Sequence, residues 1–134
     1  MDEDIDINRI FDHWIYNADK DFVTLKNLYA SKDYTWALFI GHIVIEKLIK
    51  ASVVKNRKNH APFTHDLTKL ASFSGLAFSE EQLDWLDTIT AFNLNARYDS
   101  YKQAFYQKCT PDYTEEWFDK ILKLRTWIKD KQSK

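Results

Sequence analysis

Apolar side chains recur at steps of three and four residues along most of this chain, which is the spacing of an amphipathic helix. The first stripe covers residues 7–30, and the second covers residues 34–55. Further stripes cover residues 66–73, residues 79–96 and a last segment that begins near Asp112 or Thr114, the two residues suited to cap it. The intervening connections are short, so we expect neighbouring helices to run antiparallel.

Polar residues stand where three of these helices would begin. Asp6 and Asp33 precede the first and second stripes, and we expect both side chains to accept hydrogen bonds from free amides of the first turn. Ser79 is followed three residues later by Gln82, which is the pattern of a capping box. The segment 98–111 carries no clear stripe and stays unassigned, although its Phe105 would suit a helix.

Gly41 lies in the middle of the second stripe, where a glycine costs about 1 kcal/mol relative to alanine. We therefore expect another helix to pass close to it, either within the bundle or in a second copy of the chain. These elements predict an all-α fold, an antiparallel up-down bundle of four long helices and one short helix, in a single domain over residues 1–134. Only two glycines and two prolines argue against a strand-rich fold with many turns.

The net charge of −1 gives no overall attraction to nucleic acid or membrane, so binding to either would need a local patch. No apolar run reaches the length of about 18 residues that a membrane span requires, and we expect no membrane association. The acidic start of the chain does not resemble a signal peptide. The single cysteine, Cys109, excludes an internal disulfide and is expected to be a partly buried structural thiol. We expect a cytoplasmic protein.

Positive charges gather at the end of the second stripe. Between positions 46 and 58 one acid, Glu46, stands against five basic residues, namely Lys47, Lys50, Lys55, Arg57 and Lys58. Such a patch suits phosphate groups. The same charges also complement the negative end of the helix dipole, and this structural interpretation stays open.

His65 is a second candidate, because an imidazole can donate or accept a proton near neutral pH. It stands between Thr64 and Asp66, at the start of the short helix. A purely structural interpretation applies here too, since either neighbour can cap that helix and the dipole favours a negative charge at Asp66.

Asn93 and Arg97 lie four residues apart and therefore on one helical face, where an apolar row becomes polar. Arg97 carries a planar, permanently charged fork that suits phosphate or carboxylate. The structural alternative is an ion pair between Arg97 and a carboxylate such as Asp66 or Asp99, which would tie two helix ends together.

His42 and Glu46 are also four residues apart, but two ligands are too few for a metal site, so no metal is expected. We expect instead that Glu46 bonds to His42 or pairs with Lys50 one turn beyond. Two glycines in the whole chain exclude a phosphate-cradling loop or a dinucleotide fingerprint, and no cofactor is expected.

Three segments, at residues 46–51, 64–67 and 93–98, occur in an order that resembles the HEPN family over about residues 14–127. They read Glu-Lys-Leu-Ile-Lys-Ala, Thr-His-Asp-Leu and Asn-Leu-Asn-Ala-Arg-Tyr. The resemblance implies a bundle of four or five helices that forms a homodimer and acts close to nucleotides or RNA. Many members work beside a small nucleotidyltransferase, as toxin and antitoxin or as parts of one nucleotide-transfer system.

Active members of that family are metal-independent ribonucleases with an arginine, four to six intervening residues and a histidine. Arg97 is the one residue here that matches the arginine, and no histidine follows it. After Arg57, His60 comes too early and His65 one residue too late. The decisive motif is therefore incomplete, and without the histidine a base or acid of suitable pKa is missing for attack by a 2′-hydroxyl.

The leading hypothesis is a HEPN homodimer with no or weak catalysis that binds a nucleotide or RNA phosphate, or docks a nucleotidyltransferase partner. Arg97 would grip the phosphate, Asn93 would orient the ligand, and His65 would add a hydrogen bond. The full set of expected ligand-binding residues is Arg97, Asn93, His65, Asp66, Lys50, Arg57 and Tyr98.

One alternative is a metal-independent endoribonuclease that uses Arg97 and His65. The other is a non-enzymatic protein-interaction module, so enzymatic activity stays open with a non-catalytic role favoured.

Overall fold

The computed structural model describes residues 5–134, which form six helices and no strand. Four helices are long, namely α1 (Ile7–Ala30), α2 (Tyr34–Arg57), α4 (Glu80–Arg97) and α6 (Pro111–Gln132). Two are short, α3 (Leu67–Phe73) and α5 (Asp99–Lys108). The all-α prediction is confirmed. The expected number of short helices is wrong by one, because the unassigned segment forms α5.

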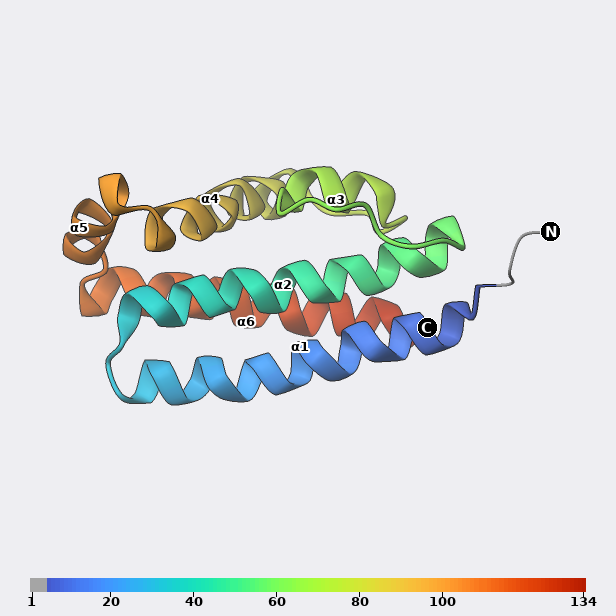
Figure 1. Ribbon diagram of the computed structural model, residues 1–134, viewed down its shortest axis with the longest axis horizontal. Helices are drawn as coiled ribbons and strands as arrows, with labels where there is room; N and C mark the ends of the chain where they lie inside the picture. Colours follow the sequence, from blue (N-terminus) through green and yellow to red (C-terminus); the bar gives the residue numbers. More distant parts are fainter. Residues whose placement is uncertain (1–4) are drawn as a thin grey trace.

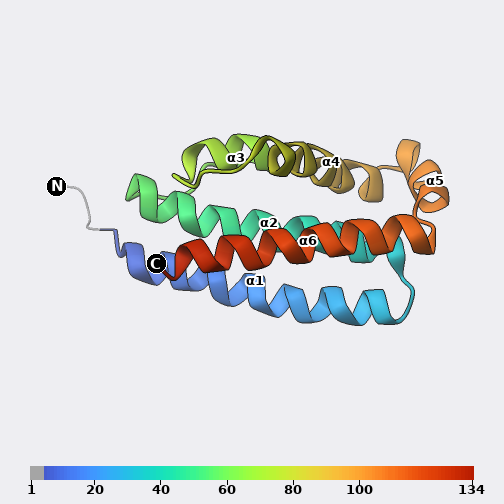
Figure 2. The ribbon, with the colours of Figure 1, turned by 180° about the vertical axis from the view of Figure 1, so that it is seen from behind.

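The long helices run side by side along the molecule, and α2 lies at the centre (Figure 1). Helices α1 and α2 form a hairpin, and α3 with α4 covers α2 on the opposite side from α1. Seen from behind, α6 passes in front of α2, between α1 and the α3–α4 layer (Figure 2). Helix α5 lies across the end of the bundle where α4 stops, and it returns the chain to α6.

The core is built on α2, whose apolar positions carry almost no exposed surface. Leu38, Ile45 and Leu48 are fully buried, together with Leu25 of α1 and Leu124 of α6. Burying a side chain of this size contributes about 1.5–3 kcal/mol, so α2 holds the bundle together by contacting helices on several sides. The prediction that α2 is the most buried element is confirmed.

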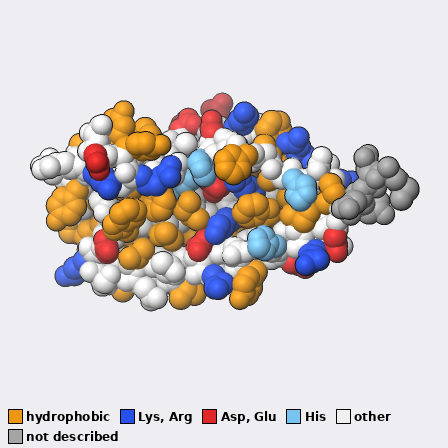
Figure 3. Space-filling view, in the orientation of Figure 1, with side chains coloured by type: hydrophobic (Ala, Val, Ile, Leu, Met, Phe, Trp, Pro, Cys, Tyr) orange, Lys and Arg blue, Asp and Glu red, His pale blue; other side chains and the backbone are white. Residues whose placement is uncertain are grey.

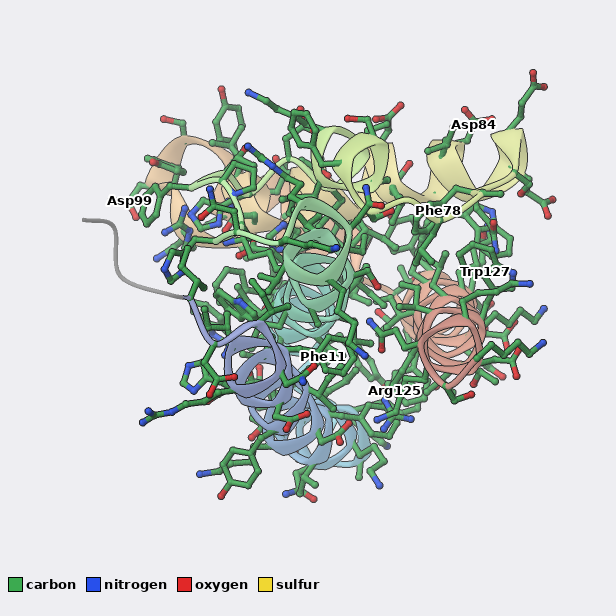
Figure 4. The ribbon with its side chains drawn as sticks, turned by 90° about the vertical axis from the view of Figure 1, so that its right-hand side faces the viewer. Phe11, Phe78, Asp84, Asp99, Arg125 and Trp127 are labelled. Carbon is green, nitrogen blue, oxygen red and sulfur yellow. The ribbon has the colours of Figure 1, made fainter. Side chains whose placement is uncertain are left out.

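Contacts at the edges of the bundle fix how the outer helices sit against one another. Viewed end-on, Phe78 of the α3–α4 connection faces Trp127 of α6, with ring centroids 4.8 Å apart (Figure 4). Arg125 of α6 reaches α1, where its guanidinium lies 3.7 Å from the centroid of the Phe22 ring and donates to Asp19 at 3.3 Å. These contacts join α6 both to α1 and to the segment before α4.

Gly41 of α2 lies against Ile121 of α6. A Cβ atom at this position would lie 2.5 Å from Cδ1 of Ile121, a distance that real Cβ contacts do not show. The close neighbour that the sequence requires is therefore within the bundle.

Two predicted helix caps are confirmed and two are wrong. Asp6 accepts from the amide of Arg9 at 3.0 Å, and Ser79 forms the expected capping box at the start of α4. Asp33 precedes α2, but its side chain makes no capping bond. At α6 the cap is Thr110, which accepts from Tyr113 N at 3.2 Å, in place of the expected Asp112 or Thr114. Pro111 explains the earlier start, because a proline without an N–H is suited to the first helical position.

Cys109 is buried at the junction of α5 and α6, as expected for a structural thiol. Burial raises the pKa of this thiol to about 11, so it stays protonated near neutral pH. Among the helices of residues 5–134, none combines the length and the apolar character needed to cross a membrane.

Candidate functional site

Glu46 is a carboxylate buried in the middle of α2, with 5% of its surface exposed. A buried charge needs partners, because its transfer out of water is costly. Both of its oxygens have one: Oε2 accepts from Nζ of Lys50 at 3.0 Å, and Oε1 lies 2.8 Å from Nδ1 of His65. The carboxylate thus joins a core helix to the connection between α2 and α3.

Lys50 lies one turn beyond Glu46 and is itself buried. The predicted ion pair between these two residues is confirmed. The ammonium of Lys50 also lies 5.3 Å from the ring centroid of Trp14 on α1. Because Glu46 balances its charge, Lys50 does not supply the local positive field that was expected from the sequence.

His42 lies one turn before Glu46 and has no exposed surface. Its Nε2 is 3.0 Å from the backbone carbonyl of His65, so Nε2 carries a proton and donates it to that oxygen. Burial lowers the pKa of His42 most, and the positive charges of His65 and Arg97 lower it further. The bond to the His65 carbonyl and the charge of Glu46 act in the opposite direction. The net lowering favours a neutral imidazole at this position.

His65 is consequently held twice by α2, once through its carbonyl and once through its ring. Its side chain remains 47% exposed. The carboxylate of Glu46 can only accept a hydrogen bond, so Nδ1 of His65 carries the proton and donates it. Nε2 is left as the nitrogen through which the ring can contact a ligand.

Arg97 lies at the last turn of α4, two turns after Thr90, whose side chain bonds to the start of α3. Its Nε donates to the carbonyl of Asn93 at 3.1 Å, and its guanidinium lies 5.7 Å from the Tyr98 ring centroid. In the part of the chain that is described, Arg97 forms no ion pair with Asp66 or Asp99. Asp99 pairs instead with Lys102 at 3.6 Å.

The start of α3 is fixed by two sets of bonds. Asp66 accepts from the amides of Thr68 and Lys69 at 3.1 and 3.2 Å, so it is the cap of α3. The amide of Leu67 donates to Oγ1 of Thr90 on α4 at 3.1 Å. Thr90, Asn93 and Arg97 follow one another at helical steps of three and four and therefore share a face of α4. This face leads from the start of α3 to the end of α4.

The structure thus brings some of the predicted site residues together and separates others. His65 and Lys50 share the carboxylate of Glu46, whereas Arg97 lies at the end of α4 with its guanidinium 5.7 Å from the ring centroid of Tyr98, the next residue. Tyr98 is 51% exposed. Arg57 stands eleven residues beyond Glu46 along α2, about 16 Å away at the rise of a helix. Its guanidinium lies over Phe73 at the end of α3, so Arg57 does not belong to this cluster.

Sequence reasoning did not identify Glu46 or His42 as parts of the site. The signal was present in the spacing, because three ionisable residues, His42, Glu46 and Lys50, recur every four residues within a mostly apolar stretch of α2. It did not reveal that the third partner would be His65. Within residues 5–134 no group of three or more histidine, cysteine, aspartate or glutamate side chains is placed to hold a metal ion.

Neither a curated protein nor a solved structure matches this chain. The family model of the HEPN domain matches residues 11–131, a stretch that begins in α1 and ends in α6. It includes all of the residues that form the Glu46 cluster and the polar face of α4. The chain belongs to the HEPN domain family.

Proposed function

We propose that this HEPN protein binds the phosphate of a nucleotide or of RNA at a surface formed by His65, Asn93 and Arg97. One observation carries the proposal: the inner nitrogen of a half-exposed imidazole, His65, is held by the buried carboxylate of Glu46. Arg97 is placed near this ring by α4, because Thr90, two turns earlier on the same face, accepts from the amide of Leu67, two residues after His65.

The charges at this surface suit an anion. Glu46 accepts from Nδ1–H of His65, so the ring turns Nε2 outward, toward the proposed phosphate. Arg97 adds a planar fork of donors that matches phosphate oxygens. Hydrogen bonds from charged donors to phosphate are about twice as strong as neutral ones, so the guanidinium of Arg97 is the main anchor in this proposal.

The proposal extends to assembly. Membership of the HEPN family supports a homodimer that acts with a nucleotidyltransferase partner, in a toxin–antitoxin-like pair. The family match over residues 11–131 supports a single domain for the whole chain. In this arrangement the phosphate held by His65 and Arg97 would belong to the nucleotide or RNA on which the pair acts.

A ribonuclease is the second candidate, because a carboxylate that holds Nδ1 of a histidine is also how a catalytic base is oriented. Cleavage by a 2′-hydroxyl needs a base and an acid. In the described cluster around Glu46, His65 is the one imidazole with exposed surface, since His42 is fully buried. This shortage of proton-transfer groups favours binding without cleavage.

Titration calorimetry with inorganic phosphate, AMP and a short single-stranded RNA, in chelator, tests the proposal. We expect His65→Ala and Arg97→Ala each to weaken binding about tenfold, as expected for the loss of one hydrogen bond to the phosphate. Arg57→Ala is the matched control, because this exposed arginine lies outside the cluster, and it should leave affinity unchanged.

The outcomes separate the candidates. Unchanged affinity in Arg97→Ala contradicts the proposed phosphate site. RNA cleavage by the wild-type protein that disappears in His65→Ala would establish the ribonuclease instead. If no phosphate compound binds and both variants only lose stability, the polar cluster is structural and the protein is an interaction module.

A further inference from the structure

A hollow of about 560 Å³ opens between the start of α1 and the connection from α2 to α3. Its apolar part includes Ile10 and Trp14 of α1, and its polar part includes Asp6, Arg9 and His60. Pockets for small molecules measure about 300–1,000 Å³, so this hollow has room for a ligand of nucleotide size. None of its residues takes part in the phosphate site proposed above.

The hollow adjoins that phosphate site through Trp14. This indole lines the hollow and also contacts the ammonium of Lys50, with 5.3 Å between Nζ and the ring centroid. Lys50 bonds to Glu46 at 3.0 Å, and Glu46 holds His65 at 2.8 Å. The connection between α2 and α3 also joins the hollow to the phosphate site, since His65 lies five positions after His60 and a chain of that length reaches at most about 17 Å.

The side chains on the surface between the hollow and His65 also suit a single extended ligand. Histidine side chains gather on the face of the molecule shown in Figure 3, with lysine and arginine side chains between them. Phe63 belongs to the same connection, and its side chain is 99% exposed. Its ring centroid lies 6.3 Å from that of His65. An aromatic ring thus stands in solvent beside the proposed phosphate site and on the chain segment that leads to the hollow.

The chemistry of the hollow suits a nucleobase better than a second phosphate. The charges of Asp6 and Arg9 cancel formally, so the attraction for an anion is small. Asp6 uses Oδ1 to cap α1, which leaves Oδ2 as an acceptor, while Arg9 and His60 offer donors. The edge of a base carries both donors and acceptors, and its flat face can stack on an indole for about 1–3 kcal/mol.

A comparison with the other large hollow supports this assignment. That hollow, of about 570 Å³, lies between α1 and α6 and is lined by Asp112, Glu115, Glu116 and Asp119. Its carboxylates would repel any nucleotide. The hollow beside Trp14 therefore combines suitable size, an aromatic wall and contact with the cluster that holds His65.

We propose that the hollow beside Trp14 is a base subsite, which binds the unpaired base of a nucleotide or single-stranded RNA whose phosphate lies at His65 and Arg97. This inference rests on the proposed function, because the phosphate site defines where the ligand continues. An unpaired base is required, because a paired one would not present its edge to Asp6 and Arg9.

Proton–nitrogen correlation spectra of the full chain test the subsite through the indole signal of Trp14. Inorganic phosphate, AMP and adenosine are added separately. We expect AMP and adenosine to shift the Trp14 signal and phosphate to leave it in place. The double variant Arg9→Ala/His60→Ala should bind AMP about fivefold more weakly, as expected when stacking remains but edge contacts are lost, with phosphate affinity unchanged. Lys123→Ala on α6 is the matched surface control.

The readouts distinguish this inference from the proposed function. If phosphate and AMP bind equally well and neither moves the Trp14 signal, the base subsite is wrong while the phosphate site stands. If adenosine shifts the Trp14 signal but phosphate does not bind at all, the phosphate site is wrong and the hollow still takes a base. A Trp14 signal that no base-containing ligand moves overturns the subsite in every case.

Discussion

His65 and Glu46 lie 2.8 Å apart at Nδ1 and Oε1, which links a half-exposed ring in a connection to a carboxylate inside a core helix. A histidine in a connection would ordinarily take whatever rotamer the solvent allows. Here the buried partner restricts the ring to orientations that leave Nε2 outward. The proposed site is therefore arranged before any ligand binds, and its geometry depends on buried groups that the proposed ligand would not touch.

The first prediction concerns the ion pair of Glu46 and Lys50. Glu46→Leu removes the carboxylate and leaves a buried ammonium without its counter-charge, which should cost about 3–5 kcal/mol of unfolding free energy. Urea unfolding followed by circular dichroism measures the loss. In the double variant Glu46→Leu/Lys50→Met both charges are gone, and most of the stability should return. If the double variant lost as much unfolding free energy as the two single variants together, the two charges would not stabilise each other.

The second prediction concerns pH. The pKa of His42 is lowered below its usual 6.5, chiefly by burial, so the unfolded chain binds this proton more readily than the folded one. The unfolding free energy is therefore highest above pH 6.5, where His42 is neutral in both states. It decreases as the pH falls from 6.5 toward the pKa of His42 in the folded protein, by at most about 1.4 kcal/mol per pH unit.

This dependence is checked by measuring the unfolding free energy between about pH 5 and pH 8, a range of about three units around the ordinary histidine pKa. His42→Gln should flatten the curve, because glutamine can still donate to the His65 carbonyl but does not titrate. His13→Gln, at an exposed histidine of α1, serves as the matched control. An equal change in both variants would contradict the assignment to His42.

The third prediction concerns the contact of α2 with α6. Gly41→Ala places a methyl group 2.5 Å from Cδ1 of Ile121, a side chain with no exposed surface. The crowding should outweigh the gain of about 1 kcal/mol in helix propensity and destabilise the protein by about 1–2 kcal/mol. Ile121→Val removes Cδ1, so thermal unfolding of the double variant should show most of the loss restored. A stabilised Gly41→Ala protein would contradict the close approach.

The fourth prediction concerns the joint between α3 and α4. Thr90→Val keeps the shape of the side chain but removes the oxygen that accepts from the amide of Leu67. An unsatisfied buried amide costs about 1–3 kcal/mol, and we expect a loss of that size in urea unfolding. Phosphate affinity should also fall, because Leu67 lies two residues after His65. Thr126→Val, at an exposed threonine of α6, should change neither quantity.

Much of the fold follows from periodicity alone. The bounds of α1 and the capping box of Ser79 agree with the structure, because a long apolar stripe and a side-chain cap are local properties of the sequence. Helix α5 was missed because its apolar positions are few and only Phe105 is buried. Thr110 was missed for a related reason: competing polar residues follow it, and Pro111 decides between them.

The candidate site was less accessible to sequence reasoning. His65 and Arg97 could be named, since each is a chemically distinctive residue near a helix end. The partner of His65 lies nineteen residues earlier in the chain, and no local pattern pairs it with Glu46. Lys50 and Arg57 have the same charge and lie on the same helix, yet one is buried and paired while the other is exposed at the helix end. That difference arises only when the helices are assembled.

The bond from His42 to the carbonyl of His65 fixes the backbone of His65 directly on the core helix α2. The position of His65 therefore does not depend on the residues that precede it. Because the buried side chain of His42 bonds to the backbone at this point, residues 58–64 are not needed to orient the His65 ring. Lengthening or shortening that stretch, or giving it new side chains, should therefore leave the imidazole in position. Under the proposed function, a change of ligand preference would then need new side chains only in this connection and no redesign of the helices beneath it.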